Sequence, residues 1–116
     1  MTGIAFFGTR ALEEVVDFYV DRLGCSVWLE QPDCTVLKYD NQLLGFCDRE
    51  EAETGGTLTF VVEDREAVDA LHEALADVAR GEPVENERYE IYQFFGDDPE
   101  GRTVEVQAFL HPTEPV

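Results

Sequence analysis

Apolar and polar positions follow the same succession of patterns in both halves of this 116-residue chain. The first half predicts a strand, a helix and three strands, over residues 3–9, 11–23, 26–30, 35–39 and 43–47. The second half predicts the same five elements again, over residues 57–63, 65–79, 84–88, 90–95 and 103–110. The chain therefore has the order βαβββ, a polar linker, and βαβββ.

This repetition predicts a single domain of the α+β class. One βαβββ unit cannot bury a full sheet face alone, so we expect the two units to pack together. The predicted fold is two βαβββ repeats that form a curled mixed sheet around a cavity, with the helices outside. Repeat one spans residues 1–48, the linker 49–56 and repeat two 57–111.

The ends of the two predicted helices carry typical capping residues. Thr9 and Asp64 precede the helical spacing and are predicted N-caps, because their side chains can accept hydrogen bonds from backbone N–H groups. Gly24 and Gly81 follow the two predicted helices and are expected to end them in a left-handed conformation.

Alternation along the last strand assigns its faces. Val104, Val106 and Ala108 are predicted to pack on the helix, so Glu105 and Gln107 face the concave side. A carboxylate there is costly unless it is paired or bound. Glu105 is therefore a candidate metal ligand, general base or hydrogen-bond acceptor for a ligand. The alternatives are a solvated side chain at the mouth of the cavity and a pair with an arginine.

The same alternation applies to the first strand of each repeat. It places Ile4 and Phe6 on the helix, and Phe7 and Thr57 on the concave side. Aromatic side chains are candidate walls of a binding site, with core packing as the alternative for each. These candidates are Phe7, Trp28, Phe46, Tyr92 and Phe94.

Composition narrows the range of partners. The chain has 26 acidic and 8 basic residues, a formal charge of −18. We expect neither nucleic acid nor an anionic membrane as a partner, because both attract basic proteins.

Without an apolar run of about 18 residues or a leader sequence, we expect a cytoplasmic protein. The dispersed acids and the single lysine, Lys38, favour a halophile over an ordinary acidic protein.

The three cysteines show no spacing typical of a disulfide framework or a zinc site. Cys25, Cys34 and Cys47 are odd in number and form no C-x-x-C motif. We expect all three to be buried free thiols.

Two motifs resemble a known superfamily. Residues 17–25 (DFYVDRLGC) resemble its helix end, and residues 94–106 (FFGDDPEGRTVEV) resemble its last hairpin, with 57–64 opening the second repeat. With the motifs in this order along the chain, the sequence resembles the vicinal oxygen chelate superfamily. That superfamily includes glyoxalase I, bleomycin-resistance proteins and extradiol dioxygenases. The resemblance covers nearly the whole chain and implies a paired βαβββ fold and a homodimer.

The resemblance also implies where a metal would bind. Metal-dependent members take four ligands, one each from the first and last strands of each repeat. Those positions map to Gly3, Thr57, Glu105 and either Gly45 or Leu44, and Glu105 alone matches. One carboxylate and a hydroxyl are too few ligands for Zn²⁺, Ni²⁺ or Fe²⁺. We therefore expect no metal or other cofactor.

The two histidines do not complete such a site. His72 lies at the edge of the apolar stripe of its helix and is expected to pack or cap there. His111 follows the last strand and is expected in the C-terminal tail, with a ligand role across a dimer as the alternative.

These observations predict a metal-free small-molecule-binding protein, with Glu105, Gln107 and Thr57 as polar contacts. The alternative is a lyase, isomerase or dioxygenase that depends on a divalent metal. A structural or regulatory dimer and a metal-free enzyme with Glu105 as base remain as further alternatives.

Overall fold

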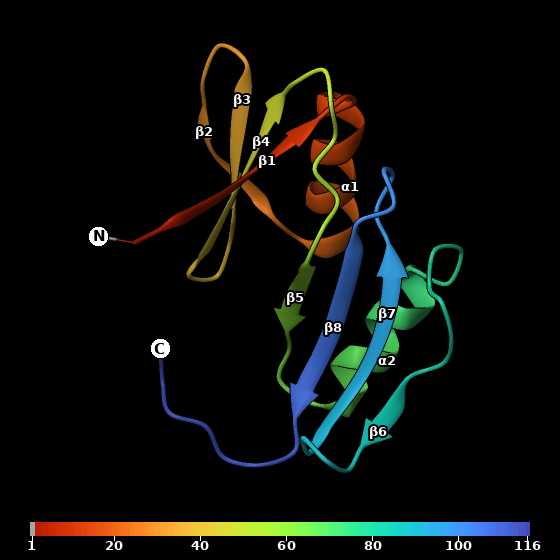
Figure 1. Ribbon diagram of the computed structural model, residues 1–116. Helices are drawn as coiled ribbons and strands as arrows, with labels where there is room; N and C mark the ends of the chain where they lie inside the picture. The colour runs from red at the N-terminus through yellow and green to blue at the C-terminus, as the bar shows by residue number, and fades with distance from the viewer. Residues whose placement is uncertain (1) are drawn as a thin grey trace. The chain divides into compact units, whose positions relative to one another are not determined.

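The computed structural model describes residues 2–116, which form two compact units (Figure 1). Unit 1 runs to Gly55 and includes Pro99–Gly101, and unit 2 comprises Gly56–Asp98 and Arg102–Val116. Each unit holds one helix and one open four-stranded sheet. The predicted α+β class and the repeated βαβββ order are confirmed.

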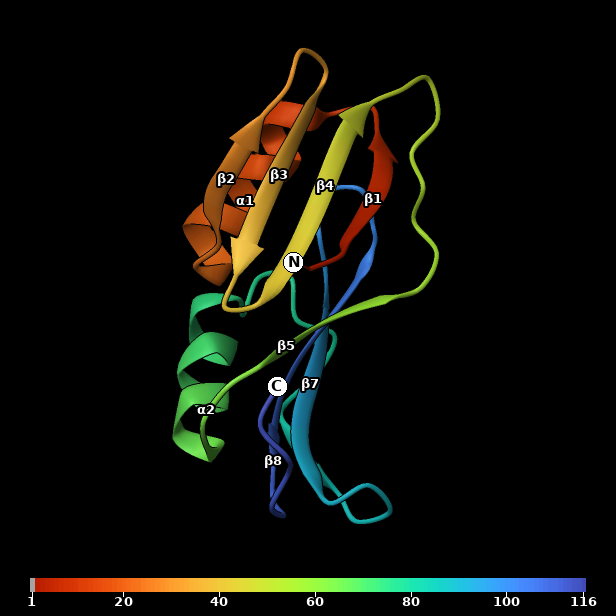
Figure 2. The same cartoon turned by 90° about the vertical axis from the view of Figure 1, so that its left-hand side faces the viewer.

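Unit 1 contains a mixed sheet with a helix on one face. Its elements are β1 (Ile4–Thr9), α1 (Leu12–Leu23), β2 (Ser26–Glu30), β3 (Cys34–Tyr39) and β4 (Gln42–Asp48). The strand order is β1-β4-β3-β2, with β1 parallel to β4 and the other pairs antiparallel. Figure 2 shows α1 behind this sheet.

Unit 2 repeats this topology. Its elements are β5 (Thr57–Val61), α2 (Arg65–Ala74), β6 (Val84–Asn86), β7 (Ile91–Asp97) and β8 (Thr103–Phe109). The strand order is β5-β8-β7-β6, and the β5–β8 pair is parallel. The central strand β8 therefore lies between β5 and β7, which positions the site described below.

The helix ends agree with the sequence in part. The Asp64 side chain accepts a hydrogen bond from the Ala67 N–H at 2.9 Å, which confirms the predicted cap of α2. Gly24 ends α1 with a φ of 77°, as predicted. The predicted cap of α1 was misplaced by two residues, because Ala11 is its N-cap and Thr9 instead accepts a hydrogen bond from the Ala11 N–H at 3.0 Å.

Helix α2 is shorter than predicted, and its predicted end at Gly81 was wrong. It ends at Ala74, because the following segment bonds to the end of β7 instead of continuing the helix. The Arg80 N–H donates to the Phe95 carbonyl at 2.8 Å, and the Asp97 N–H donates to the Val78 carbonyl at 3.1 Å.

The face assignment of β1 was also wrong. Phe7 pairs with Phe46 across the parallel β1–β4 ladder, and their ring centroids lie 5.9 Å apart. Phe46 in turn stacks on Tyr19 of α1 at 5.1 Å, so Phe7 faces the helix. Ile4 and Phe6 therefore lie on the opposite face, where half of the Phe6 surface is exposed. Pairing with β4 decides which side chains of β1 face the helix. The nearly continuous apolar run of β1 does not reveal this choice.

Two of the three cysteines form a disulfide, so the expectation of three free thiols was wrong. Cys34 and Cys47 lie directly opposite each other on β3 and β4, with their Cα atoms 4.0 Å apart. Cys25 is free and buried, and burial raises the pKa of its thiol to about 11. A disulfide is unusual in a reducing compartment, which weighs against the predicted cytoplasmic location.

Within residues 2–116, no helix combines the length and the apolar character needed to cross a membrane.

Candidate functional site

The candidate site is a hollow of about 1080 Å³ in unit 2. It lies on the sheet face opposite α2, which we call the open face of unit 2. Val104, Val106 and Ala108 of β8 are buried, and Phe94, paired with Val106, has its ring 5.0 Å from that of His72 on α2. Glu105 and Gln107 point the other way and line the hollow, which confirms the predicted alternation of β8.

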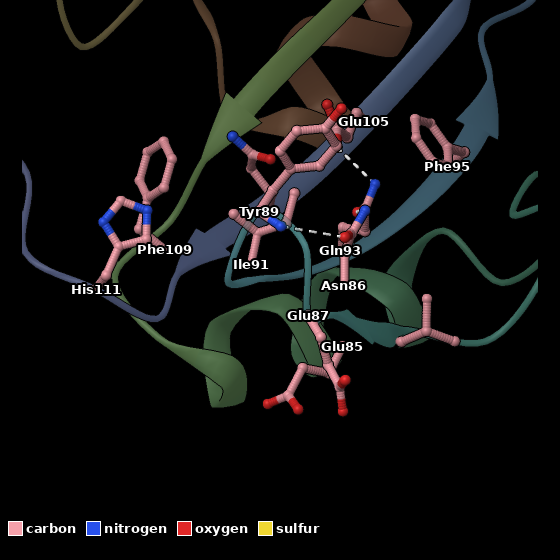
Figure 3. Close-up of a pocket in the computed structure, with 12 residues that line it drawn as sticks. Glu85, Asn86, Glu87, Tyr89, Ile91, Gln93, Phe95, Glu105, Phe109 and His111 are labelled. Carbon is pink, nitrogen blue, oxygen red and sulfur yellow. Dashed lines mark hydrogen bonds between the residues drawn. The ribbon is translucent and has the colours of Figure 1, made fainter.

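Glu105 is held from both sides by neighbouring strands. The Thr59 hydroxyl on β5 donates to Oε1 at 2.7 Å, and the Gln93 amide on β7 donates to Oε2 at 2.8 Å. The Asn86 amide on β6 donates to Gln93 Oε1 at 3.1 Å, so the nitrogen of Gln93 is turned toward the carboxylate (Figure 3). One hydrogen-bonded chain of side chains therefore links all four strands and fixes the carboxylate.

Apolar side chains surround this polar chain. The lining includes the aromatic residues Tyr89, Phe95 and Phe109, with Ile91 on the same face as Gln93. The three aromatic side chains are all exposed. A small number of fixed polar groups among apolar walls is typical of small-molecule sites.

The charge of the hollow is negative. Its lining contains Glu85, Glu87 and Glu105, and none of the described residues that line it is a Lys or Arg. Glu85 forms an ion pair with Arg65 of α2, and both Glu85 and Glu87 extend away from Glu105 (Figure 3). Glu105 is therefore the carboxylate that the hollow presents to a ligand.

His111 lines the hollow from the segment after β8. Its ring centroid lies 5.4 Å from that of Phe109, and its Nδ1 lies 2.9 Å from the Pro112 carbonyl oxygen. His72, by contrast, sits on α2 with its Nε2 2.9 Å from the Gly81 carbonyl oxygen. His72 is thus occupied with packing and capping, as expected from its place on the helix.

The other predicted contacts of unit 2 lie outside the hollow. Thr57 is exposed at the start of β5, and Thr59, two positions along the same face, contacts Glu105 instead. Phe94 is buried against α2. The Tyr92 hydroxyl donates to Asp69 of α2 at 2.7 Å, and this hydrogen bond raises the pKa of Tyr92. The structure brings neither Tyr92 nor Phe94 to Glu105.

Three predicted aromatic contacts belong to unit 1. Phe46 is buried under α1. Trp28 is exposed on β2. Phe7 borders a second hollow of about 290 Å³, together with Phe6 and the Cys34–Cys47 disulfide.

Sequence reasoning missed the β7 side of the site. Gln93 and Phe95 alternate with Tyr92 and Phe94, so choosing the phase of β7 would have found them. The register of the β7–β8 hairpin supplies that phase, because Phe95 lies opposite Glu105. Asn86 and His111 had no comparable signal, since one lies on a three-residue strand and the other follows the last strand.

The donor set around Glu105 does not fit a transition-metal ion. The groups that contact the carboxylate are a hydroxyl and the NH₂ end of an amide, which donates hydrogen bonds and cannot ligate. In the part of the chain that the structure describes, no three His, Cys, Asp or Glu side chains gather closely enough to hold a metal. A catalytic zinc site needs about three protein ligands.

Comparison with known proteins identifies the fold. No protein-family model matches the chain. No curated protein matches its sequence either. Solved structures do match, and a glyoxalase/bleomycin resistance protein/dioxygenase family enzyme from Burkholderia phytofirmans superposes with a TM-score of 0.80 at 23% identity. That match covers 92% of this chain and 97% of the other.

Two further structures extend the likeness. An integron cassette protein from a sewage-outfall metagenome of Halifax Harbour gives a TM-score of 0.79 at 20% identity, over 94% of this chain and 98% of that one. Lactoylglutathione lyase from Agrobacterium tumefaciens gives 0.76 at 21% identity, over 93% and 92%. The fold is therefore that of the glyoxalase/bleomycin resistance/dioxygenase proteins, as the sequence motifs implied.

Proposed function

We propose that this chain is a small-molecule-binding protein of the glyoxalase/bleomycin resistance/dioxygenase superfamily that works without a metal centre. Its ligand occupies the hollow on the open face of unit 2. The observation that carries this proposal is the fixed carboxylate of Glu105, held by Thr59 and Gln93 among apolar walls. Such a site supplies a preorganised anchor and an apolar surface, which are the two ingredients of small-molecule affinity.

The proposal extends to the assembly and the source of the protein. Strand β2 exposes Val27, Trp28 and Leu29, and a second copy of the chain would cover such apolar side chains in a homodimer. The charge of −18 with a single lysine supports a halophilic source. Binding experiments should therefore be run in high KCl. Light scattering in the same buffer measures the molar mass and so tests the homodimer.

Metal analysis separates this proposal from a metalloenzyme. Protein purified without chelator should contain far less than one equivalent of Zn, Ni, Mn or Fe by mass spectrometry. A stoichiometric metal that is lost in Glu105→Gln would contradict the proposal and favour the metal-dependent lyase, isomerase or dioxygenase.

A thermal-shift screen tests binding itself. A ligand that binds only the folded state raises the unfolding midpoint. We expect hits whose shifts shrink in Glu105→Gln and in Phe95→Ala, because both side chains line the hollow. Glu73→Gln is the matched control, since it removes one charge from the exposed face of α2. Shifts that all survive both hollow variants would place binding elsewhere.

A further inference from the structure

We propose that the ligand of the open face of unit 2 is an organic cation with two parallel N–H donors, a guanidinium or amidinium, on an apolar body. This inference rests on the proposed function and specifies its ligand class. It follows from the charge of the hollow, the remaining acceptor positions of Glu105 and the apolar walls.

The charge of the hollow favours a positive charge on the ligand. The hydroxyl of Thr59 and the amide of Gln93, which bond Glu105, are neutral. Within residues 2–116, no Lys or Arg lines the hollow, and Arg65 is engaged with Glu85, whose side chain extends away from Glu105. The lining carboxylates therefore disfavour an anionic ligand at Glu105, whereas a cation gains a charge-assisted hydrogen bond there.

The remaining acceptor positions of Glu105 favour a forked donor. A carboxylate has about four lone-pair positions, two on each oxygen. Thr59 uses one on Oε1 and Gln93 uses one on Oε2, so each oxygen can accept one more hydrogen bond. A planar N–C–N fork donates to both oxygens at once. A neutral primary amide cannot, because its carbonyl oxygen would face the second carboxylate oxygen.

The walls favour an apolar body attached to that fork. Phe95 and Phe109 flank the Glu105–Gln107 face of β8. Tyr89 lines the same hollow, but the Arg88 guanidinium lies over its ring at 5.5 Å, so Phe95 and Phe109 offer the faces for a cation. Aromatic faces within about 6 Å of a cation attract it, and their area buries an apolar ligand body. A volume of about 1080 Å³ admits a drug-sized molecule.

Three isosteric probes test this inference by titration calorimetry. Benzamidinium, benzamide and benzoate share a phenyl body and differ in charge, from +1 through 0 to −1. We expect benzamidinium to bind at least about tenfold more tightly than benzamide, and benzoate not to bind. Glu105→Gln should remove most of the advantage of benzamidinium over benzamide. Glu73→Gln should leave it unchanged, which excludes a general attraction of cations to this acidic protein.

Several outcomes would overturn the inference. These are equal binding of benzamidinium and benzamide, no binding of benzamidinium, and equal losses in Glu105→Gln and Glu73→Gln. The proposed function would still stand if neutral fragments from the thermal-shift screen depended on Phe95. Circular dichroism of Glu105→Gln checks that a loss of binding is not a loss of folding, and Glu105→Asp should retain part of the preference for the cation.

Discussion

The open faces of the two units, which are the sheet faces opposite α1 in unit 1 and α2 in unit 2, share a topology and differ in chemistry. At the centre of unit 2, Thr59 pairs with Glu105 across the parallel β5–β8 ladder. At the matching place in unit 1, Phe6 pairs with Gly45 across β1 and β4. A carboxylate with a hydroxyl thus corresponds to an aromatic ring lying over a glycine. A Cβ at Gly45 would overlap the Phe6 ring, so this glycine makes room for the phenylalanine.

The neighbouring pair differs in the same way. Two residues further along the central strand, Gln107 pairs with Gln93 in unit 2, and Cys47 pairs with Cys34 in unit 1. Unit 2 carries polar side chains open to a hollow, whereas unit 1 carries a disulfide. Four positions on a repeated sheet thus distinguish an open face with a hydrogen-bonded carboxylate from one with an aromatic ring and a disulfide.

The largest expected loss of stability comes from a change at a hairpin turn. In unit 1 the β3–β4 turn is formed by Asp40 and Asn41. Between β7 and β8, Asp98 and Arg102 of unit 2 form an ion pair at 3.0 Å across residues 99–101, and both side chains are buried. Asp98→Ala should lower the free energy of unfolding by about 3–5 kcal/mol, because it removes the carboxylate that pairs with a buried guanidinium. Urea unfolding in KCl measures this.

Asp97→Ala is the control for that prediction. Asp97 pairs with Arg80 at 2.6 Å, but both side chains are more than 40% exposed. This variant should cost at most about 1 kcal/mol. Equal costs for Asp97→Ala and Asp98→Ala would show that burial does not distinguish the two pairs.

The second prediction concerns the disulfide on the open face of unit 1. The Cys34–Cys47 disulfide closes a loop with a sequence separation of 13. Reduction should lower the free energy of unfolding by about 3 kcal/mol, because the unfolded chain regains loop entropy. A Cys34→Ala/Cys47→Ala variant should be equally destabilised and insensitive to reductant. Denatured, unreduced protein should titrate one thiol, Cys25, and a count of three would contradict the disulfide.

The smallest effect tests the Phe6–Gly45 contact. Gly45→Ala should cost about 1–3 kcal/mol, because the new methyl group displaces the Phe6 ring. Adding Phe6→Ala should recover most of that cost in a double-mutant cycle. Gly3→Ala is the control, since no described residue other than the chain neighbours of Gly3 lies within 4 Å of a Cβ there. Additive costs for the Phe6→Ala and Gly45→Ala variants would mean that the ring does not occupy this space.

The repeated fold could be predicted because its signals are local. Helical stripes, the Asp64 cap and the turns each depend on a few adjacent residues. Helix α2 was predicted too long because a distant segment, the end of β7, bonds the residues that would have continued it. The residues of the helix and its neighbours in the sequence do not indicate that β7 will bond to this segment.

The site could be predicted on β8 and not on β7. In residues 103–109, apolar and polar side chains alternate, so both the period and the phase are visible. In residues 91–97 and 4–9, adjacent aromatic residues hide the phase, which the pairing with a central strand sets. The disulfide did have a signal, because Cys34 and Cys47 are equidistant from the turn at Asp40 and Asn41, which lies between the strands predicted over 35–39 and 43–47.

The disulfide loop also encloses the only lysine of the chain, Lys38 on β3. A lysine-specific protease can therefore cut this protein once, and the cut falls between the two linked cysteines. The nicked protein remains one covalent molecule and keeps its full mass on a non-reducing gel. Reducing agent then releases two fragments of unequal length, so a single digestion reports both the pairing of the cysteines and the accessibility of β3.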